Sequence, residues 1–177
     1  MNRIIVVFLG IMLLGGCSAS IDGDTYANQT PALSLEQFFD GNVKAWGIVQ
    51  NRSGDVVQRF TVDIKGSMDG QTLILNETFD YEVGEGPDKR IWQISPNGNG
   101  KYTGKAGDIL STAEGTSYGN AFNFRYEMDL PVDDTTYQVA FDDWFWAFKD
   151  GTLMNRSYVK KFGLVMAEVT IFMQQQP

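Results

Sequence analysis

The stretch VVQRFTVDIKGSMDGQTLILNETFDYEV, residues 56–83, decides the fold expected for this chain. In its first half polar and apolar side chains alternate, and the apolar face carries Phe60, Val62 and Ile64. Such alternation is typical of a strand with one buried face. The pair Asp69–Gly70 predicts a tight hairpin turn. The second half keeps the same period, and one of its faces carries Leu73, Leu75, Glu77, Phe79 and Tyr81.

The same pattern extends over most of the chain. Short strand-like segments run from residue 43 to residue 174, and turn residues separate them, for example in NRSGD (51–55) and SPNGNG (95–100). One short helix is expected at residues 34–40, with Ser34 as its N-cap. Many short strands with regular turns predict a β-sandwich or a β-barrel.

The segment DDWFWAFKDG, residues 142–151, is apolar on both sides of the strand that it predicts. Both of its faces therefore need cover. We expect Trp144, Trp146 and Phe148 to face the interior, because three large aromatic side chains in a row are poorly suited to water. The short helix at 34–40 is the candidate cover for the opposite face.

The first residues have the features of a secretion signal. Arg3 precedes the apolar run IIVVFLGIMLL (4–14), which is too short to span a bilayer comfortably. The letters LGGC then end at Cys17, and this order resembles the signal of bacterial lipoproteins. The resemblance implies cleavage between Gly16 and Cys17, diacylglycerol on the Cys17 sulfur, and an acyl chain such as palmitate on its amine. The alternative is an ordinary signal peptide with a chance cysteine.

The chain accordingly divides into a signal peptide (1–16), an acylated cysteine with a flexible tether (17–33) and a β-domain (34–177). Cys17 is the only cysteine, so no intramolecular disulfide can form. Ser18 follows it, and by resemblance to sorted lipoproteins this favours the periplasmic face of the outer membrane. The net charge of −8 disfavours nucleic acid or an anionic lipid surface as a partner. Membrane attachment would therefore rest on the lipid.

The composition disfavours most classes of enzyme. The chain contains no histidine, which removes serine and cysteine triads, histidine bases and most zinc sites. Cys17 is assigned to lipidation, so no cysteine nucleophile remains, and we expect no metal and no cofactor. An enzyme would need a carboxylate with a raised pKa in an apolar pocket, such as Glu77 or Asp143.

Charged and aromatic side chains within the expected strands are the candidates for ligand binding. Glu77, Arg90 and Arg156 could point into the domain and hold a carboxylate or phosphate group through a guanidinium, or they could point outward. Arg125 is expected to face outward. The aromatic residues could line a cavity for an apolar ligand or fill a core. The candidate residues are Arg156, Arg90, Glu77, Trp144, Trp146, Trp92, Asp143 and Asn155.

Several segments together resemble a family of uncharacterised bacterial lipoproteins. They include FFDGNVKAWGIVQNRSG (38–54), LNETFDYEVGEGPDKRIW (75–92), FDDWFW (141–146) and MNRSYVKKFG (154–163). The resemblance implies a lipocalin-like, antiparallel up-and-down β-barrel of about 8–10 strands with one short N-terminal helix. The family's genes tend to lie near enzymes that modify membrane fatty acids, which implies a role in envelope lipid handling.

Three functions follow as hypotheses. The first is a lipid-anchored barrel that binds an apolar or amphipathic ligand, such as a fatty acid or part of a phospholipid. The second is an accessory module with a filled core that binds a protein partner through an exposed aromatic patch. The third is an enzyme that works through carboxylates without histidine. Ligand binding is the first choice, and catalysis is the least favoured.

Overall fold

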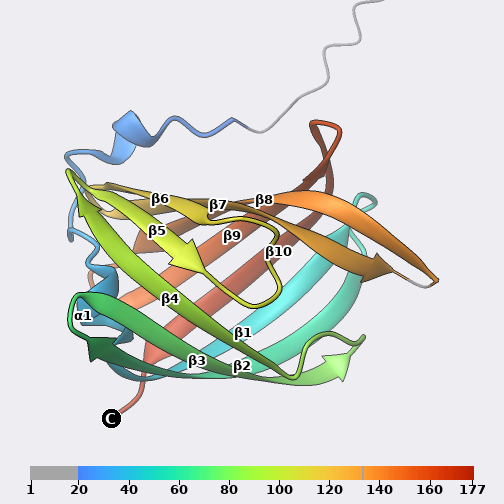
Figure 1. The fold of residues 1–177 in the computed structure, drawn as a ribbon, viewed down its shortest axis with the longest axis horizontal. Coiled ribbons are helices and arrows are strands. Elements are labelled where there is room, and N and C mark those ends of the chain that lie inside the picture. The colour runs from blue at the N-terminus through green and yellow to red at the C-terminus, as the bar shows by residue number, and fades with distance from the viewer. Residues whose placement is uncertain (1–19, 133) are drawn as a thin grey trace, which may run out of the picture.

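The computed structural model describes residues 20–132 and 134–177, and its ten antiparallel strands close into a barrel (Figure 1). Each strand pairs with the next along the chain, and the first pairs with the last. The strands are β1 (Gly41–Asn51), β2 (Val56–Asp69), β3 (Thr72–Val83), β4 (Lys89–Gly98), β5 (Lys101–Lys105), β6 (Ala113–Tyr118), β7 (Ala121–Val132), β8 (Thr135–Ala147), β9 (Thr152–Lys161) and β10 (Leu164–Gln175). The all-β, up-and-down barrel expected from the sequence is therefore confirmed.

The hairpin of β2 and β3 forms as its sequence predicts. Asp69 pairs with Thr72 across the turn, where Gly70 has a φ of 60° that favours glycine. Phe60, Val62 and Ile64 of β2 and Leu73 and Leu75 of β3 face the interior, where they join one continuous core. Strand β1 closes the barrel by pairing with β10, from Val43 opposite Gln175 to Asn51 opposite Ala167.

A short helix closes one end of the barrel. Helix α1 (Leu35–Phe39) begins at Ser34, whose side-chain oxygen accepts a hydrogen bond from the backbone N–H of Gln37. Its apolar side chains are buried in the core, and the helix packs on β2 and β3. Gly66 of β2 allows this packing, because a β-carbon there would overlap the carbonyl oxygen of Phe39.

The opposite end of the barrel is less covered, and we call it the open end. Several side chains of the core that lie towards this end are only half-buried, whereas the apolar side chains of α1 itself are buried; the half-buried ones include Phe79, Tyr81, Leu130, Phe141 and Val169. The β3–β4 loop lies beside it, held where the side-chain amide of Gln58 donates to the carbonyl oxygen of Glu85. The barrel therefore has one sealed end and one partly exposed aromatic end.

The segment from residue 20 to residue 33, which we call the strap, packs along the outer wall. It contains the short 3-10 helix η1 (Gly23–Tyr26), which lies against β6 and β7 (Figure 1). The backbone N–H of Leu33 donates to the carbonyl oxygen of Gly119 at 2.8 Å. A β-carbon at Gly23 would overlap the ring of Tyr118. The composition of these residues predicts a flexible tether, but in the structure they pack closely against the wall.

The strap explains why one prediction about β8 is wrong. Trp144 and Trp146 face outward, and the ring of Tyr26 in the strap lies 6.1 Å from each of them. Trp144 is nevertheless only 1% exposed, because the strap and Tyr118 cover it. Trp144 is thus buried without entering the barrel, while Trp146 is half-buried. Phe148 lies beyond the end of β8 and is 49% exposed, so it does not face inward either.

The cover for β8 also differs from the one expected. Phe145, on the opposite face from Trp144, belongs to the core, so the inner face of β8 is covered by the rest of the barrel. Helix α1 packs elsewhere, on β2 and β3. Within the described part of the chain, no helix is long and apolar enough to cross a bilayer. Residues 1–19, which include the predicted signal peptide and Cys17, lie outside the described residues.

Candidate functional site

The interior contains an unusual group of ionisable side chains, which we call the inner cluster. Its members are Glu77 of β3, Arg90 of β4, Asp108 of the β5–β6 loop, Tyr126 of β7 and Asp143 of β8. Glu77 lies directly opposite Arg90 in the β3–β4 register and opposite the core residue Ile64 in the β2–β3 register. Strand pairing therefore turns both Glu77 and Arg90 towards the core.

Arg90 is held by Asp108 rather than by its neighbour on β3. Its Nη2 and Nε lie 2.6 Å and 2.9 Å from Asp108 Oδ2, and its guanidinium carbon lies 6.0 Å from the centre of the Phe79 ring. Asp108 Oδ1 is buried, and none of the described residues forms a hydrogen bond with it. Among the described residues Glu77 makes neither an ion pair nor a side-chain hydrogen bond. The Arg90 guanidinium thus attracts both Asp108 and Glu77 but is in contact only with Asp108.

The other half of the inner cluster centres on Asp143. The Tyr126 hydroxyl donates to Asp143 Oδ2 at 3.2 Å, while Asp143 Oδ1 is buried without a partner among the described residues. Asp143 itself is 7% exposed. Ser157 lies directly opposite it on β9 and donates to Asn155 Oδ1 at 3.3 Å, and the Asn155 side-chain amide donates to the Trp144 carbonyl at 3.1 Å.

Burial changes the protonation of the inner cluster. It raises the pKa of Glu77 from 4.5 to about 7, against the attraction of Arg90 and with the repulsion of Asp108 and Asp143. It also raises the pKa of Asp143 from 3.8 to about 7, although the Ser157 and Tyr126 hydroxyls favour the ionised form. Both carboxyls therefore titrate near neutral pH, which is typical of functional sites.

A second group of charges, the outer cluster, lies on the outer wall and contains Asn123, Arg125, Asp142 and Lys160. Lys160 Nζ is 2.6 Å from Asp142 Oδ2, while Arg125 Nε and Asn123 Nδ2 donate to Asp142 Oδ1 at 3.2 Å and 2.8 Å. Partial burial works to raise the pKa of Asp142, but the hydrogen bonds from Lys160, Asn123 and Arg125 hold it below its usual value. Every charge in this cluster has a partner.

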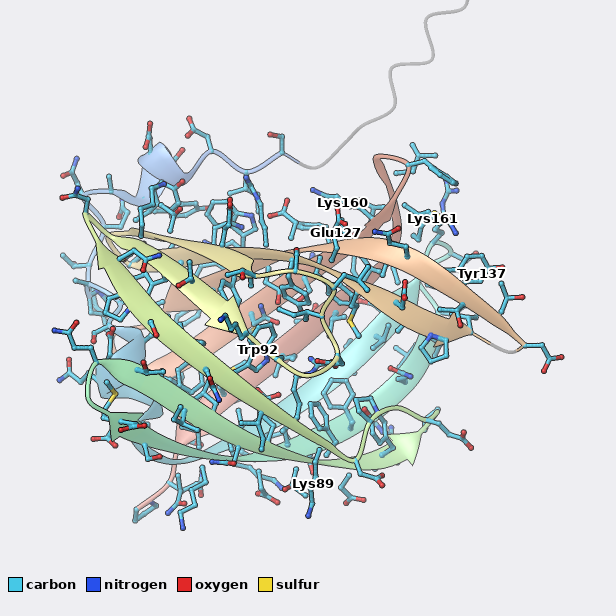
Figure 2. The ribbon with its side chains drawn as sticks, viewed as in Figure 1. Lys89, Trp92, Glu127, Tyr137, Lys160 and Lys161 are labelled. Atoms are coloured by element: carbon cyan, nitrogen blue, oxygen red, sulfur yellow. The ribbon has the colours of Figure 1, made fainter. Side chains whose placement is uncertain are left out.

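The outer cluster lines a hollow of about 510 Å³ outside the barrel. The strap residues Ser20 and Ile21, the loop before β6 and the outer faces of β7–β9 border it. Figure 2 shows Lys160 and Glu127 near each other on this side of the molecule. The lining is mostly polar, and Asp142, Lys160 and Arg125 are already paired with one another, so these three side chains offer little free energy to an incoming charged group.

The structure separates the sequence-predicted candidates into two sets. Glu77, Arg90, Asp143 and Asn155 lie inside, and so does Trp92, whose ring centre is 5.2 Å from those of Phe124 and Tyr126 (Figure 2). Trp144, Trp146 and Arg156 lie outside. Of the two orientations left open for Arg156, the structure shows the outward one. Arg156 pairs with Glu168 on the outer wall at 3.2 Å, and Arg125 faces outward as expected.

Sequence reasoning missed two members of the inner cluster. Tyr126 shares its strand face with Phe122 and Phe124, so the alternation of β7 could have identified it as an interior residue. Asp108 has no such signal, because it reaches Arg90 from a loop. No group of residues within the described ranges has the composition of a metal site.

The geometry defines the class of protein. This is a closed, antiparallel ten-stranded barrel with one end sealed by a helix and an acid-rich cluster in its interior. The chain belongs to the family described as "Protein of unknown function (DUF3833)", whose model matches residues 11–175. This match confirms the resemblance to an uncharacterised family. No curated protein matches the chain significantly.

Proposed function

We propose that this protein is an envelope lipoprotein that binds an amphipathic ligand at the open end of its barrel. Lipid on Cys17 would hold it at the periplasmic face of the outer membrane. The apolar part of the ligand would lie against the half-buried aromatic side chains of the open end. Its polar head would meet the inner cluster, and no catalytic step is required.

The observation that carries this proposal is the order of side chains inside the barrel. At the open end, Phe79 and Tyr81 stack nearly parallel with ring centres 6.1 Å apart, and both are only half-buried. On β7 and β8 the Phe141 ring stacks on Tyr126 with ring centres 5.0 Å apart, and the Tyr126 hydroxyl donates a hydrogen bond to Asp143. An apolar surface that ends in a small number of polar groups is the usual lining of a ligand site.

Figure 2 shows Tyr137 and Lys161 near each other to the right of the molecule. Lys161 Nζ lies 3.9 Å from the centre of the Tyr137 ring. This cation is engaged with an aromatic ring on β8 and β9, away from the inner cluster.

The anchor is supported by the sequence of the N-terminus and by the charge of the chain. A net charge of −8 gives no electrostatic attraction to anionic lipids, so attachment needs buried hydrocarbon. Each buried methylene contributes about 0.8 kcal/mol, and several acyl chains give stable anchoring. Metabolic labelling of the full chain with palmitate tests this part. Label should be present in the wild type and absent from Cys17→Ala.

Ligand binding can be tested on residues 20–177, which contain the closed barrel, its helix and the strap. We expect native mass spectra of this protein, purified from cells, to show bound amphiphile. Titration with medium-chain amphiphiles should change the tryptophan fluorescence, to which the interior Trp92 contributes. The variant Phe79→Asn should weaken binding, while Phe172→Asn, an equal change on the outer wall, should not. Clean spectra together with flat titrations would refute the proposal.

A second candidate function is protein binding through the outer wall. Four large apolar side chains lie in register across four adjacent strands, namely Trp146, Met154, Phe172 and Trp46. Trp46 is 41% exposed and Phe172 is 37% exposed, with ring centres 6.0 Å apart. A photo-crosslinker at position 46 that captures one defined envelope protein, while one at position 63 does not, would favour this function.

A further inference from the structure

The inner cluster is short of positive charge. It contains three carboxyl groups, from Glu77, Asp108 and Asp143, and one guanidinium, from Arg90. Arg90 is also the one cation among the described residues that acts on the protonation of Glu77 or Asp143. A buried charge is costly unless it is paired, so two of the three acids have no cation of their own.

The single guanidinium is already engaged. Its Nε and Nη2 lie within 2.9 Å of Asp108 Oδ2, and its guanidinium carbon lies 6.0 Å from the centre of the Phe79 ring. A ligand carboxylate or phosphate could therefore form two parallel hydrogen bonds only with the Nη1 and Nη2 edge, on a cation that Asp108 already neutralises. It would also add a fourth acid to the cluster. The structure therefore disfavours the acidic head group that the sequence alone suggested for Arg90.

Four oxygens of the cluster are available as acceptors. Asp143 Oδ1 and Asp108 Oδ1 are buried without partners among the described residues, and neither oxygen of the Glu77 carboxyl makes a hydrogen bond with them. Asp143 is more than nine-tenths buried, and its free oxygen belongs to the inner face of β8. Acceptors of this kind need a group that only donates, and an ammonium group has three donors and no acceptor.

We infer that the head group bound by the inner cluster is an ammonium group, held between the carboxylates of Glu77 and Asp143. The ligand would thus be a cationic amphiphile, an amine attached to an apolar chain. This inference rests on the proposed function, because it names the chemical class of the ligand for the same site. Binding would favour ionised carboxylates and release protons from the cluster.

Three probes with the same chain and different heads test the inference: dodecylamine, dodecanoic acid and dodecanol, each below its micelle concentration. Residues 20–177 would be titrated with each probe by calorimetry and by tryptophan fluorescence. At about pH 8 the amine should bind about tenfold more tightly than the acid, a difference of about 1.4 kcal/mol. From about pH 6 to about pH 8 its affinity should rise, since the carboxyls ionise while an alkyl ammonium stays charged.

Matched variants distinguish the effect of the inner cluster on amine binding from the effect of negative charge on the surface. Glu77→Gln and Asp143→Asn should lower the affinity for dodecylamine about tenfold while leaving dodecanol unchanged. Glu114→Gln and Asp129→Asn remove the same charge from exposed positions on the outer wall and should change neither. If an interior variant does not fold, the inference is still tested by the relative affinities of the wild type for the three probes and by the pH dependence of its affinity for dodecylamine.

The outcomes distinguish the two proposals. Tighter binding of dodecanoic acid than of dodecylamine would overturn the ammonium inference and leave ligand binding intact. Equal loss of amine binding in Glu114→Gln and Glu77→Gln would mean attraction by the surface alone, which also overturns the inference. Failure of all three probes to bind would overturn the proposed function itself.

Discussion

The inner and outer clusters differ most clearly at two adjacent residues of β8. Asp142 faces outward and accepts hydrogen bonds from Lys160, Arg125 and Asn123, which hold its pKa low. Asp143 faces inward and accepts one hydrogen bond from Tyr126, and burial raises its pKa to about 7. One strand thus carries a fully paired acid and an underpaired acid side by side. The two residues are of the same type, so the opposite shifts of their pKa values come from the side of the barrel wall that each one faces.

Removal of the interior cation should have the largest effect on stability. Arg90→Met leaves Asp108 and Glu77 without a partner, and we expect the free energy of unfolding to fall by about 3–5 kcal/mol. The matched change Arg125→Met in the outer cluster should cost about 0–1 kcal/mol, because its side chain is 62% exposed. Urea denaturation of both variants measures the difference. Equal losses would contradict the contrast between the clusters.

The second effect is a pH dependence of stability that originates inside the barrel. The folded state raises the pKa of Glu77 from 4.5 to about 7, so it binds more protons than the unfolded state over this range. The stabilisation is fully present below about pH 4.5 and is lost as the pH rises through about 7. The loss for this carboxyl is about 3 kcal/mol at most.

Urea denaturation of Glu77→Gln and Asp143→Asn at pH values from about 5 to about 8 tests this dependence. Both variants should show a flatter profile than the wild type and should gain stability relative to it at the alkaline end. Asp142 has the opposite sign, since its lowered pKa contributes stability that is lost in acid. Asp142→Asn should therefore keep the wild-type decline between these pH values.

A smaller effect is expected from the outer cluster. Lys160→Met removes one donor from Asp142, which retains Asn123 and Arg125, so the cost should be about 1–2 kcal/mol. Thermal unfolding can detect this change against Lys105→Met, a substitution at an exposed position on β5. A loss as large as that of Arg90→Met would mean that the outer ion pairs are more important to stability than their geometry indicates.

The smallest effect should come from an acid outside both clusters. Asp129→Asn lies on the exposed outer face of β7, and we expect its free energy of unfolding to stay within about 0.5 kcal/mol of the wild type. Its pH profile should overlay that of the wild type. A changed profile would show that net charge, rather than the inner cluster, controls the pH response.

Local patterns were sufficient to predict the strands but not the closure of the barrel. The alternation of Phe60, Val62 and Ile64 and the turn at Asp69–Gly70 reflect contacts between neighbouring residues. The choice between a sandwich and a barrel depends on β1 and β10, whose pairing joins residues at opposite ends of the domain. No local signal in either strand encodes that partner, so only the family resemblance pointed to a barrel.

The candidate site was predicted in part, for a related reason. Glu77 stands among apolar residues that face the core, so alternation could identify it as interior. Strand β9 reverses the usual pattern, since its inward residues include the polar Asn155 and Ser157 while Met154 faces out. Arg156 therefore looked as much like an interior residue as Glu77 did. The polar residues inside the barrel and the strap on its outer wall depend on contacts between distant parts of the chain. The alternation of residues within one strand cannot predict such contacts.

The pairing of Val43 with Gln175 shows that β10, the last strand, closes the barrel against β1. Until β10 is available, β1 and β9 both present unpaired backbone edges, and the ring cannot close. Such non-local closure is slow compared with the formation of a hairpin, because a long stretch of chain must be ordered first. Loss of the final strand would leave two open edges that invite pairing between molecules. The fold is thus an all-or-none ring, and the final strand controls both its rate of assembly and its resistance to aggregation.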